Sequence, residues 1–424
     1  MRIHIQGGRL IDPANGVDAK HDLFIADGVV AAVGKAPAGF NAERVIDATG
    51  LVVCPGLVDL AARLREPGFE YKATLQSELA AAVAGGVTSL ACPPDTDPPL
   101  DEPGLVEMLK HRARLMNLAH VYPVGALTQQ LKGERLTEMA ELTHAGCVGF
   151  SQADAPIVNT LVFYRALQYA ATFGFAVWLR PDDAFLGTSG VAHDGEVASR
   201  LGLPPIPAVS EPLEVARTLA LARDTGARVH FCRVSHADSL ALIAAAKADG
   251  LPVTCDVSIN HLHLSVTDIG YFDSNCRLTP PLRSLRDRDA LRAGLKSGVI
   301  DALCSDHAPV DDDAKQLPFG EAQPGAVGLE LLLPMTLKWA GIAGAPLSQA
   351  IARVTSAPAR VLGIDAGRLS PGDPADVCVF DPAAAWRVTP AALKSQGRNT
   401  PFAGYEVLGQ VRSTLVSGAV VHEA

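Results

Sequence analysis

Charged side chains that could do chemistry stand directly after short apolar segments of the chain. Arg63, Arg180 and Arg233 each follow or end such a segment, and Asp306 does the same further along. A carboxylate can bind a divalent metal or act as a general base. An arginine stays protonated and has no lone pair to offer a metal, but it can pair with a carboxylate or stabilise an oxyanion. These residue types predict a site rich in guanidinium groups, with one side chain able to bind a metal.

The elements that must position these side chains alternate along the middle of the chain. Eight short apolar segments are candidate strands: 51–59, 87–92, 118–125, 146–151, 174–179, 227–234, 251–257 and 299–305. Amphipathic or alanine-rich segments between them are candidate helices: 70–84, 103–116, 157–172, 211–224, 236–249 and 285–297. Eight such repeats predict an α/β fold, a (β/α)8 TIM-type barrel. In these barrels the carboxyl ends of the strands share one mouth, so the four side chains are expected to meet there.

Both ends of the chain show a different pattern. Residues 1–50 and 364–424 contain short β-type segments separated by turn residues, and no helix of useful length fits there. Neither piece could bury an apolar face alone. We therefore expect one composite β-sandwich domain built from residues 1–50 and 364–424, beside a barrel over residues 51–363.

Composition excludes several classes of protein. The 424 residues carry a formal net charge of -10, and no run of Lys and Arg appears, which argues against a nucleic-acid partner. No apolar stretch is long enough to span a bilayer, and the N-terminus does not resemble a secretory signal, so we expect a cytoplasmic protein without a membrane partner. The 8 cysteines are scattered singly, which predicts buried thiols and neither disulfides nor a zinc cluster.

Several motifs together resemble the dihydroorotase branch of the amidohydrolase superfamily, over nearly the whole chain. They are "LREPGFEYKATL", "AGGVTSLACPPDTDP", "GARVHFCRVSHADS", "TPPLRS", "DALCSDHAPVDDDAK", "PGAVGLELLLP", "GRLSPGDPADVCVFDP" and "GRNTPFAG". The resemblance implies a binuclear zinc site with four histidines and an aspartate as ligands, and a further aspartate after strand eight that serves as ligand and general acid/base.

This chain departs from that pattern at the ligand positions. Carried over one position at a time, the four histidines and the first aspartate fall on Ala61, Arg63, Arg180, Arg233 and Gln152. Asp306 alone matches, as the strand-eight aspartate. The comparison implies that the zinc site is lost. We therefore expect no metal, no other cofactor and no catalytic residue.

The positions that contact substrate in the family match unevenly. Arg65 matches the arginine of the family motif, whereas Asp95 and Thr279 stand where the family has asparagines. Val310 replaces a histidine. A substrate-like pocket is therefore expected around Arg65, Asp95 and Thr279, with altered contacts.

The overall pattern is similar to dihydroorotase-like subunits that lack activity and assemble with aspartate carbamoyltransferase. The resemblance implies a structural or regulatory role in de novo pyrimidine biosynthesis, within a hetero-oligomer that includes the aspartate carbamoyltransferase catalytic chain. Homo-oligomerisation stays open. One alternative is an active amidohydrolase with a metal-poor site acting on a cyclic amide such as dihydroorotate or a hydantoin, with Asp306 as base. Another is a sensor of small anions that binds them through its arginines.

Three structural expectations follow from the residues. Guanidinium charge is expected to replace the charge of the lost metal. At least one of Arg63, Arg180 and Arg233 should therefore pair with Asp306. His230, His261, His263 and His307 are expected to be structural, with satisfied hydrogen bonds. The polar segment 310–328 is expected to be a flexible loop at the barrel mouth.

Overall fold

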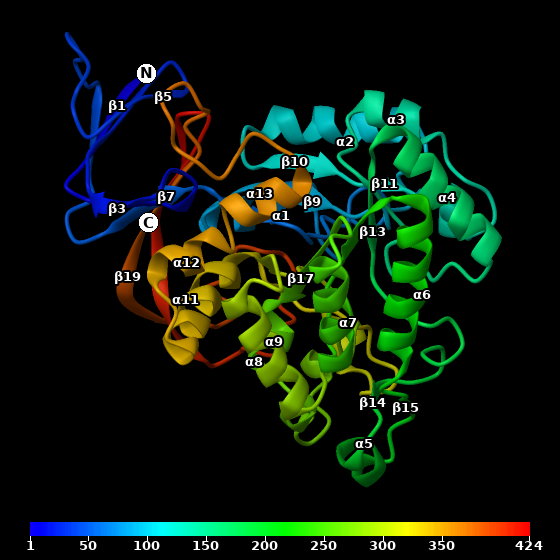
Figure 1. The fold of residues 1–424 in the computed structure, drawn as a ribbon. Coiled ribbons are helices and arrows are strands. Elements are labelled where there is room, and N and C mark those ends of the chain that lie inside the picture. The colour runs from blue at the N-terminus through cyan, green and yellow to red at the C-terminus, as the bar shows by residue number, and fades with distance from the viewer.

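Both termini contribute to one β domain that sits beside a barrel, as Figure 1 shows by the blue and red ribbons lying together. The computed structural model describes residues 1–424. One sheet of the β domain has the order β5-β4-β1-β6 and the other has the order β21-β20-β19-β7-β2-β3. The strands are β1 (Arg2–Gln6), β2 (Arg9–Asp12), β3 (Val17–Lys20), β4 (Leu23–Ala26), β5 (Val29–Val33), β6 (Arg44–Asp47), β7 (Val52–Pro55), β19 (Val377–Arg387), β20 (Glu406–Val416) and β21 (Ala419–Glu423).

The two sheets of the β domain enclose a separate apolar core. Ile3 and Ile5 from the N-terminal piece are buried in this core together with Val377 and Leu415 from the C-terminal piece. Alternating buried positions in β1 show why the strand forms: only one of its faces meets the core. The composite β-sandwich predicted from the two chain ends is confirmed.

The barrel is built from parallel strands, and every predicted strand segment contains at least one of them. They are β8 (Leu57–Asp59), β9 (Val87–Cys92), β10 (His120–Pro123), β11 (Gly125–Ala126), β12 (Phe150–Ser151), β13 (Ala176–Leu179), β16 (Arg228–Phe231), β17 (Val253–Ser258) and β18 (Ala302–Cys304). Backbone bonds between the first and last strand segments close the ring, from His307 N to Ala61 O at 2.9 Å and from Arg63 N to His307 O at 2.8 Å. The predicted barrel is confirmed.

Helices cover the outside of the barrel (Figure 1). In the whole chain the helices are α1 (Leu75–Ala84), α2 (Pro103–Met116), α3 (Met139–Ala145), α4 (Thr160–Phe173), α5 (Glu196–Leu201), α6 (Ser210–Thr225), α7 (Ala237–Ala248), α8 (Ile259–His263), α9 (Leu285–Ser297), α10 (Asp312–Gln316), α11 (Leu332–Ala343), α12 (Leu347–Ala352) and α13 (Ser356–Leu362). A short parallel pair, β14 (Ala192–His193) and β15 (Pro205–Ile206), lies outside the barrel sheet. Side-chain caps explain two helix starts, because Thr74 and Ser284 each form a capping box with the residue three positions later.

The first predicted strand, 51–59, is divided between the two domains. Val52–Pro55 forms β7 and pairs with β2 and β19 of the sandwich, whereas Leu57–Asp59 forms β8 of the barrel. Gly56 lies between them, and a Cβ atom there would stand 2.1 Å from the Thr88 hydroxyl. Only glycine tolerates so close an approach. We therefore propose that the first domain boundary falls at Gly56 and not at residue 50.

Three further features of the sequence can be compared with the structure. The segment 310–328 is not without structure, because it contains helix α10 and part of it lines the barrel mouth. All 8 cysteines are free, and only Cys232 is not fully buried. None of the helices has the length and apolar character needed to cross a membrane.

Candidate functional site

The strand ends bring the predicted charged side chains together at the carboxyl end of the barrel. Arg63 follows β8, Arg180 follows β13, Arg233 follows β16 and Asp306 follows β18. The side chains of Arg63, Arg180 and Arg233 are 6–8% exposed, and Asp306 is equally buried at 6%. Charges this deeply buried must be paired, because an isolated ion in such a place costs several kcal/mol.

Asp306 is paired as expected. Arg233 Nη1 lies 3.1 Å from Asp306 Oδ1 and also donates to the Thr279 carbonyl at 3.2 Å. Arg63 approaches the same carboxylate less closely, at 3.9 Å. Arg180 does not reach it, and its guanidinium instead contacts Asp182 at 3.0 Å.

The centre of the cluster is Asp154, a residue that the sequence analysis missed. Its carboxylate lies 2.6 Å from Arg63 Nη2, 2.7 Å from Arg180 Nε and 2.5 Å from Arg233 Nη2. Asp154 therefore joins all three arginines, whereas Asp306 joins two. Its position in "SQADAP", shortly after the end of β12, is the signal that could have revealed it, since residues that follow barrel strands lie at the mouth.

Local backbone geometry helps to aim these groups. Ala153, just before Asp154, has φ of 51°, and Arg65, Arg233 and Asp306 have φ of 62°, 55° and 51°. Such left-handed conformations are unfavourable for residues with a Cβ, by about 1 kcal/mol or more each. Four of them in one site mean that the surrounding structure holds the chain there against its local preference.

The two central carboxylates have opposite pKa shifts. Burial favours the neutral form of Asp154, but Arg233, Arg63 and Arg180 outweigh it and hold the pKa of this carboxyl well below its ordinary value. Burial raises the pKa of Asp306 to about 6, although Arg233 and Arg63 act against the rise. Asp154 is thus an anion at neutral pH, and Asp306 changes protonation in the mildly acidic range.

A cavity of about 240 Å³ opens over the cluster, with Arg65 and Lys72 in its wall. Arg65 Nε donates to the Pro309 carbonyl at 2.9 Å, and no carboxylate pairs with its guanidinium. Burial lowers the pKa of Arg65 to about 10, and the adjacent Arg63 contributes to the shift. The Asp95 carboxylate is held by Arg63 Nε at 2.7 Å. The substrate-like positions Arg65, Asp95 and Thr279 therefore do share one pocket.

The five positions at which the family resemblance implies zinc ligands, but where this chain departs from it, do not offer a donor set for zinc. Ala61 has no donor atom, and the Gln152 amide is turned to other partners, with Oε1 accepting from Thr128 at 2.9 Å and Nε2 donating to Leu131 O at 2.7 Å. The other three positions are arginines that are already paired with carboxylates. A binuclear zinc ion pair does not fit these residues, because guanidinium groups repel cations and lack lone pairs.

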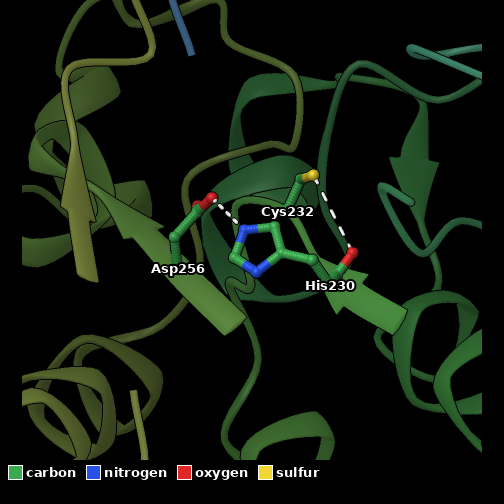
Figure 2. A group of neighbouring side chains, drawn as sticks. All are labelled: His230, Cys232 and Asp256. Carbon is green, nitrogen blue, oxygen red and sulfur yellow. Dashed lines mark hydrogen bonds and ion pairs between the residues drawn. The ribbon is translucent and has the colours of Figure 1, made fainter. Parts of the chain in front are cut away.

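A different group below the mouth could hold a metal ion. His230, Cys232 and Asp256 each offer one ligand atom, and these atoms lie within 4.8 Å of one another (Figure 2). His230 Nε2 bonds the Asp256 carboxylate at 2.8 Å, and His230 Nδ1 bonds Thr254 at 2.8 Å. Burial raises the pKa of the Cys232 thiol well above its ordinary value. A metal bound here would replace the His230–Asp256 bond and displace the thiol proton.

The histidines predicted to be structural all have hydrogen-bond partners. His307 Nε2 contacts the Glu78 carboxylate at 2.6 Å, and its Nδ1 accepts from Gly328 N at 3.1 Å. The rings of His261 and His263 bond the carbonyl groups of Pro281 and Met335 at 3.1 and 2.9 Å. His261 and His307 are bonded on both ring nitrogens, as expected, whereas Nδ1 of His263 is buried without a partner, so the expectation holds only in part for His263. His230 is also bonded on both nitrogens, although it belongs to the group that could bind a metal.

Comparisons with known proteins agree with this architecture. The family described as "Dihydro-orotase-like" matches residues 50–239, and the one described as "Amidohydrolase family" matches residues 206–422. A "Dihydroorotase-like protein" of Pseudomonas putida is 47% identical over 100% of this chain and 99% of its own length. A protein of Geobacter sp. (strain M21) named "Dihydroorotase" is 41% identical over all of both chains.

Solved structures show the same fold. L-hydantoinase from Arthrobacter aurescens has a TM-score of 0.88 and 25% identity, and the match covers 99% of this chain and 96% of that one. A D-hydantoinase has a TM-score of 0.84 at 22% identity, with 100% of this chain and 95% of that one covered, and supports the fold alone. With full-length relatives well above 30% identity and a barrel and sandwich of the hydantoinase type, this chain belongs to the amidohydrolase superfamily as a dihydroorotase-like protein.

Proposed function

We propose that this protein is a non-catalytic dihydroorotase-like subunit that supports an aspartate carbamoyltransferase chain in cytoplasmic pyrimidine biosynthesis. The observation that carries the proposal is the ion cluster around Asp154, whose three arginine partners stand where the family resemblance implies metal ligands. A zinc ion generates hydroxide at neutral pH, and a guanidinium group cannot do so. The site supports a stable fold without the chemistry of ring opening or closure.

The charge balance of the mouth favours this reading over an anion sensor. The cavity wall holds Arg63, Arg65 and Lys72 as cations against Asp95, Asp154 and Asp306 as anions. Arg180 and Arg233 add two cations to this cluster and Asp182 adds an anion, so five positive groups face four negative ones and little net attraction for an anion remains. Among the arginines of the mouth, only Arg65 lacks a carboxylate partner in the protein. It is therefore the only one whose guanidinium is free to bind a small anion.

A second candidate function is cyclic-amide hydrolysis, because several relatives carry the plain name "Dihydroorotase". The observation in its favour is the pKa of about 6 for the buried Asp306, which suits a general base. In that case Arg233, 3.1 Å from Asp306, would face the developing negative charge. Hydrolysis that disappears in Asp306→Asn would select this candidate over the first.

The subunit proposal is tested by mixing the purified protein with the aspartate carbamoyltransferase chain of the same organism. Size-exclusion chromatography with light scattering should show one peak containing both chains, and carbamoyltransferase activity should travel with it. Two separate peaks, with carbamoyltransferase activity unchanged by mixing, would contradict the proposal.

A further inference from the structure

A second cavity, of about 250 Å³, lies at the end of the barrel opposite the mouth. Its wall is made by the first residues of β13, β16 and β17, by the residue before β18 and by helix α13. Three arginines from separate parts of the chain surround it: Arg228 begins β16, Arg353 follows α12, and Arg360 belongs to α13. Because this is the amino-terminal face, the cavity is distinct from the barrel mouth, although its wall includes His230 of the group that could hold a metal.

None of these three guanidinium groups has a carboxylate partner. Arg353 Nη1 donates to the Asp301 carbonyl at 3.1 Å, and its Nε is buried with no partner. Arg228 has only a long contact, 3.5 Å, to the Gly174 carbonyl. Arg360 makes no side-chain hydrogen bond. In the mouth, by contrast, every arginine that stands at an expected ligand position is paired with an aspartate.

The one acidic side chain in the cavity wall is already neutralised. Asp301 Oδ2 accepts from Lys247 Nζ at 2.5 Å and from Cys255 N at 2.8 Å. The cavity therefore keeps a local excess of three positive charges in a protein whose net charge is -10. Its floor adds two neutral polar groups, the Thr254 hydroxyl and the His230 ring, which bond each other at 2.8 Å.

We propose that this cavity binds a small molecule that carries a phosphate group. A phosphate monoester has close to two negative charges at neutral pH and three acceptor oxygens, which suits several guanidinium forks better than a single carboxylate does. The cavity lies just below the usual size range of ligand pockets, about 300–1,000 Å³, so the ligand is a small phosphorylated metabolite. Arg353 supplies the buried donor, and Arg228 and Arg360 close over the anion from the rim.

Isothermal titration of the full chain with inorganic phosphate, and then with pyrophosphate, tests the proposal at constant ionic strength. Phosphate should bind with an affinity in the roughly millimolar range or better, and Arg360→Gln should weaken it about tenfold. Arg360 is the variant of choice because its side chain is exposed and makes no hydrogen bond, so folding is expected to survive. Arg353→Gln should have the same effect or a larger one.

Two control variants show whether phosphate binds in this cavity or at another place on the protein. Arg200→Gln removes an exposed arginine that lines none of the cavities described here, and phosphate affinity should not change. Arg65→Gln removes the arginine of the mouth without a carboxylate partner, and affinity should again be unchanged. No phosphate or pyrophosphate binding up to about 10 mM would overturn the proposal. So would binding that is lost in Arg65→Gln and retained in Arg360→Gln.

Discussion

Asp154 is the residue on which the barrel mouth depends. Its carboxylate contacts three guanidinium groups that would otherwise face one another in a largely dry site. Removing one partner of such a network leaves uncompensated charge, which costs about 3–5 kcal/mol for a fully buried pair. The side chain is 35% exposed, so solvent reduces the expected loss.

Asp154→Ala should therefore lower the free energy of unfolding by about 2–3 kcal/mol. Urea denaturation followed by circular dichroism measures this loss. Asp365→Ala is the matched control, because its exposed pair with Arg368 should contribute less than about 0.5 kcal/mol. Equal stability of the two variants would mean that Asp154 does not hold the cluster together.

Asp306 should make stability depend on pH. Its folded pKa of about 6 lies above the ordinary 3.8, so between these values the folded state holds a proton that the unfolded state has released. Stability from this group is then fully present below about pH 4 and falls as pH rises toward 6. The unfolding free energy of the wild type minus that of Asp306→Asn should therefore decrease from pH 4 to pH 7. A difference that is constant with pH would contradict the shift.

At the scale of elements, most of the barrel was predictable because each strand and helix has its own pattern. Two departures have physical reasons. The apolar segment 51–59 contributes one strand to the sandwich and one to the barrel. The break between the two strands falls at Gly56, which packs closely against Thr88, and the apolar pattern does not reveal it. Helix α11 was not among the expected helices, and it tolerates Pro334 because this residue lies in the first turn, where no intrahelical N–H bond is lost.

Part of the site was also predictable, because the positions of the strands could be recognised from their residue pattern. Residues that stand directly after strands could be placed at the mouth by topology, and Arg63, Arg180, Arg233 and Asp306 do meet there. Asp154 lies on a loop whose direction depends on the left-handed backbone of Ala153. No pattern of residue types in the sequence fixes such a turn at an alanine.

Gly56→Ala tests the junction between the domains. The new Cβ would meet Thr88 Oγ1 at 2.1 Å and Thr88 Cγ2 at 2.3 Å, so stability should fall by about 1–3 kcal/mol. Thr88→Ala removes both of these atoms, and in combination with Gly56→Ala it should recover part of the loss. Thermal unfolding of the two single variants and the double variant measures the coupling. Simple additivity would show that the contact with Thr88 is not what requires glycine.

At the scale of the whole molecule, the fold is expected to be independent of zinc. The mouth is held by ion pairs, so a chelator should leave the melting temperature unchanged, and elemental analysis should find well under one zinc per chain. Cys232→Ser distinguishes a metal bound by His230, Cys232 and Asp256 from zinc ions bound at the mouth, because it removes a ligand from the first group alone. Zinc that is lost in Cys232→Ser would assign a metal to that group. Two zinc ions per chain, retained in Cys232→Ser, would contradict the account of the mouth.

We propose that the ion cluster around Asp154 has taken the place of a hydrolytic metal centre. The most direct measurement is the rate of dihydroorotate hydrolysis, and of the reverse ring closure, by the purified protein with and without added zinc. We expect no turnover above the protein-free rate in either direction, with Asp306→Asn indistinguishable from wild type. Turnover that requires Asp306 would contradict it and would establish the protein as an active amidohydrolase.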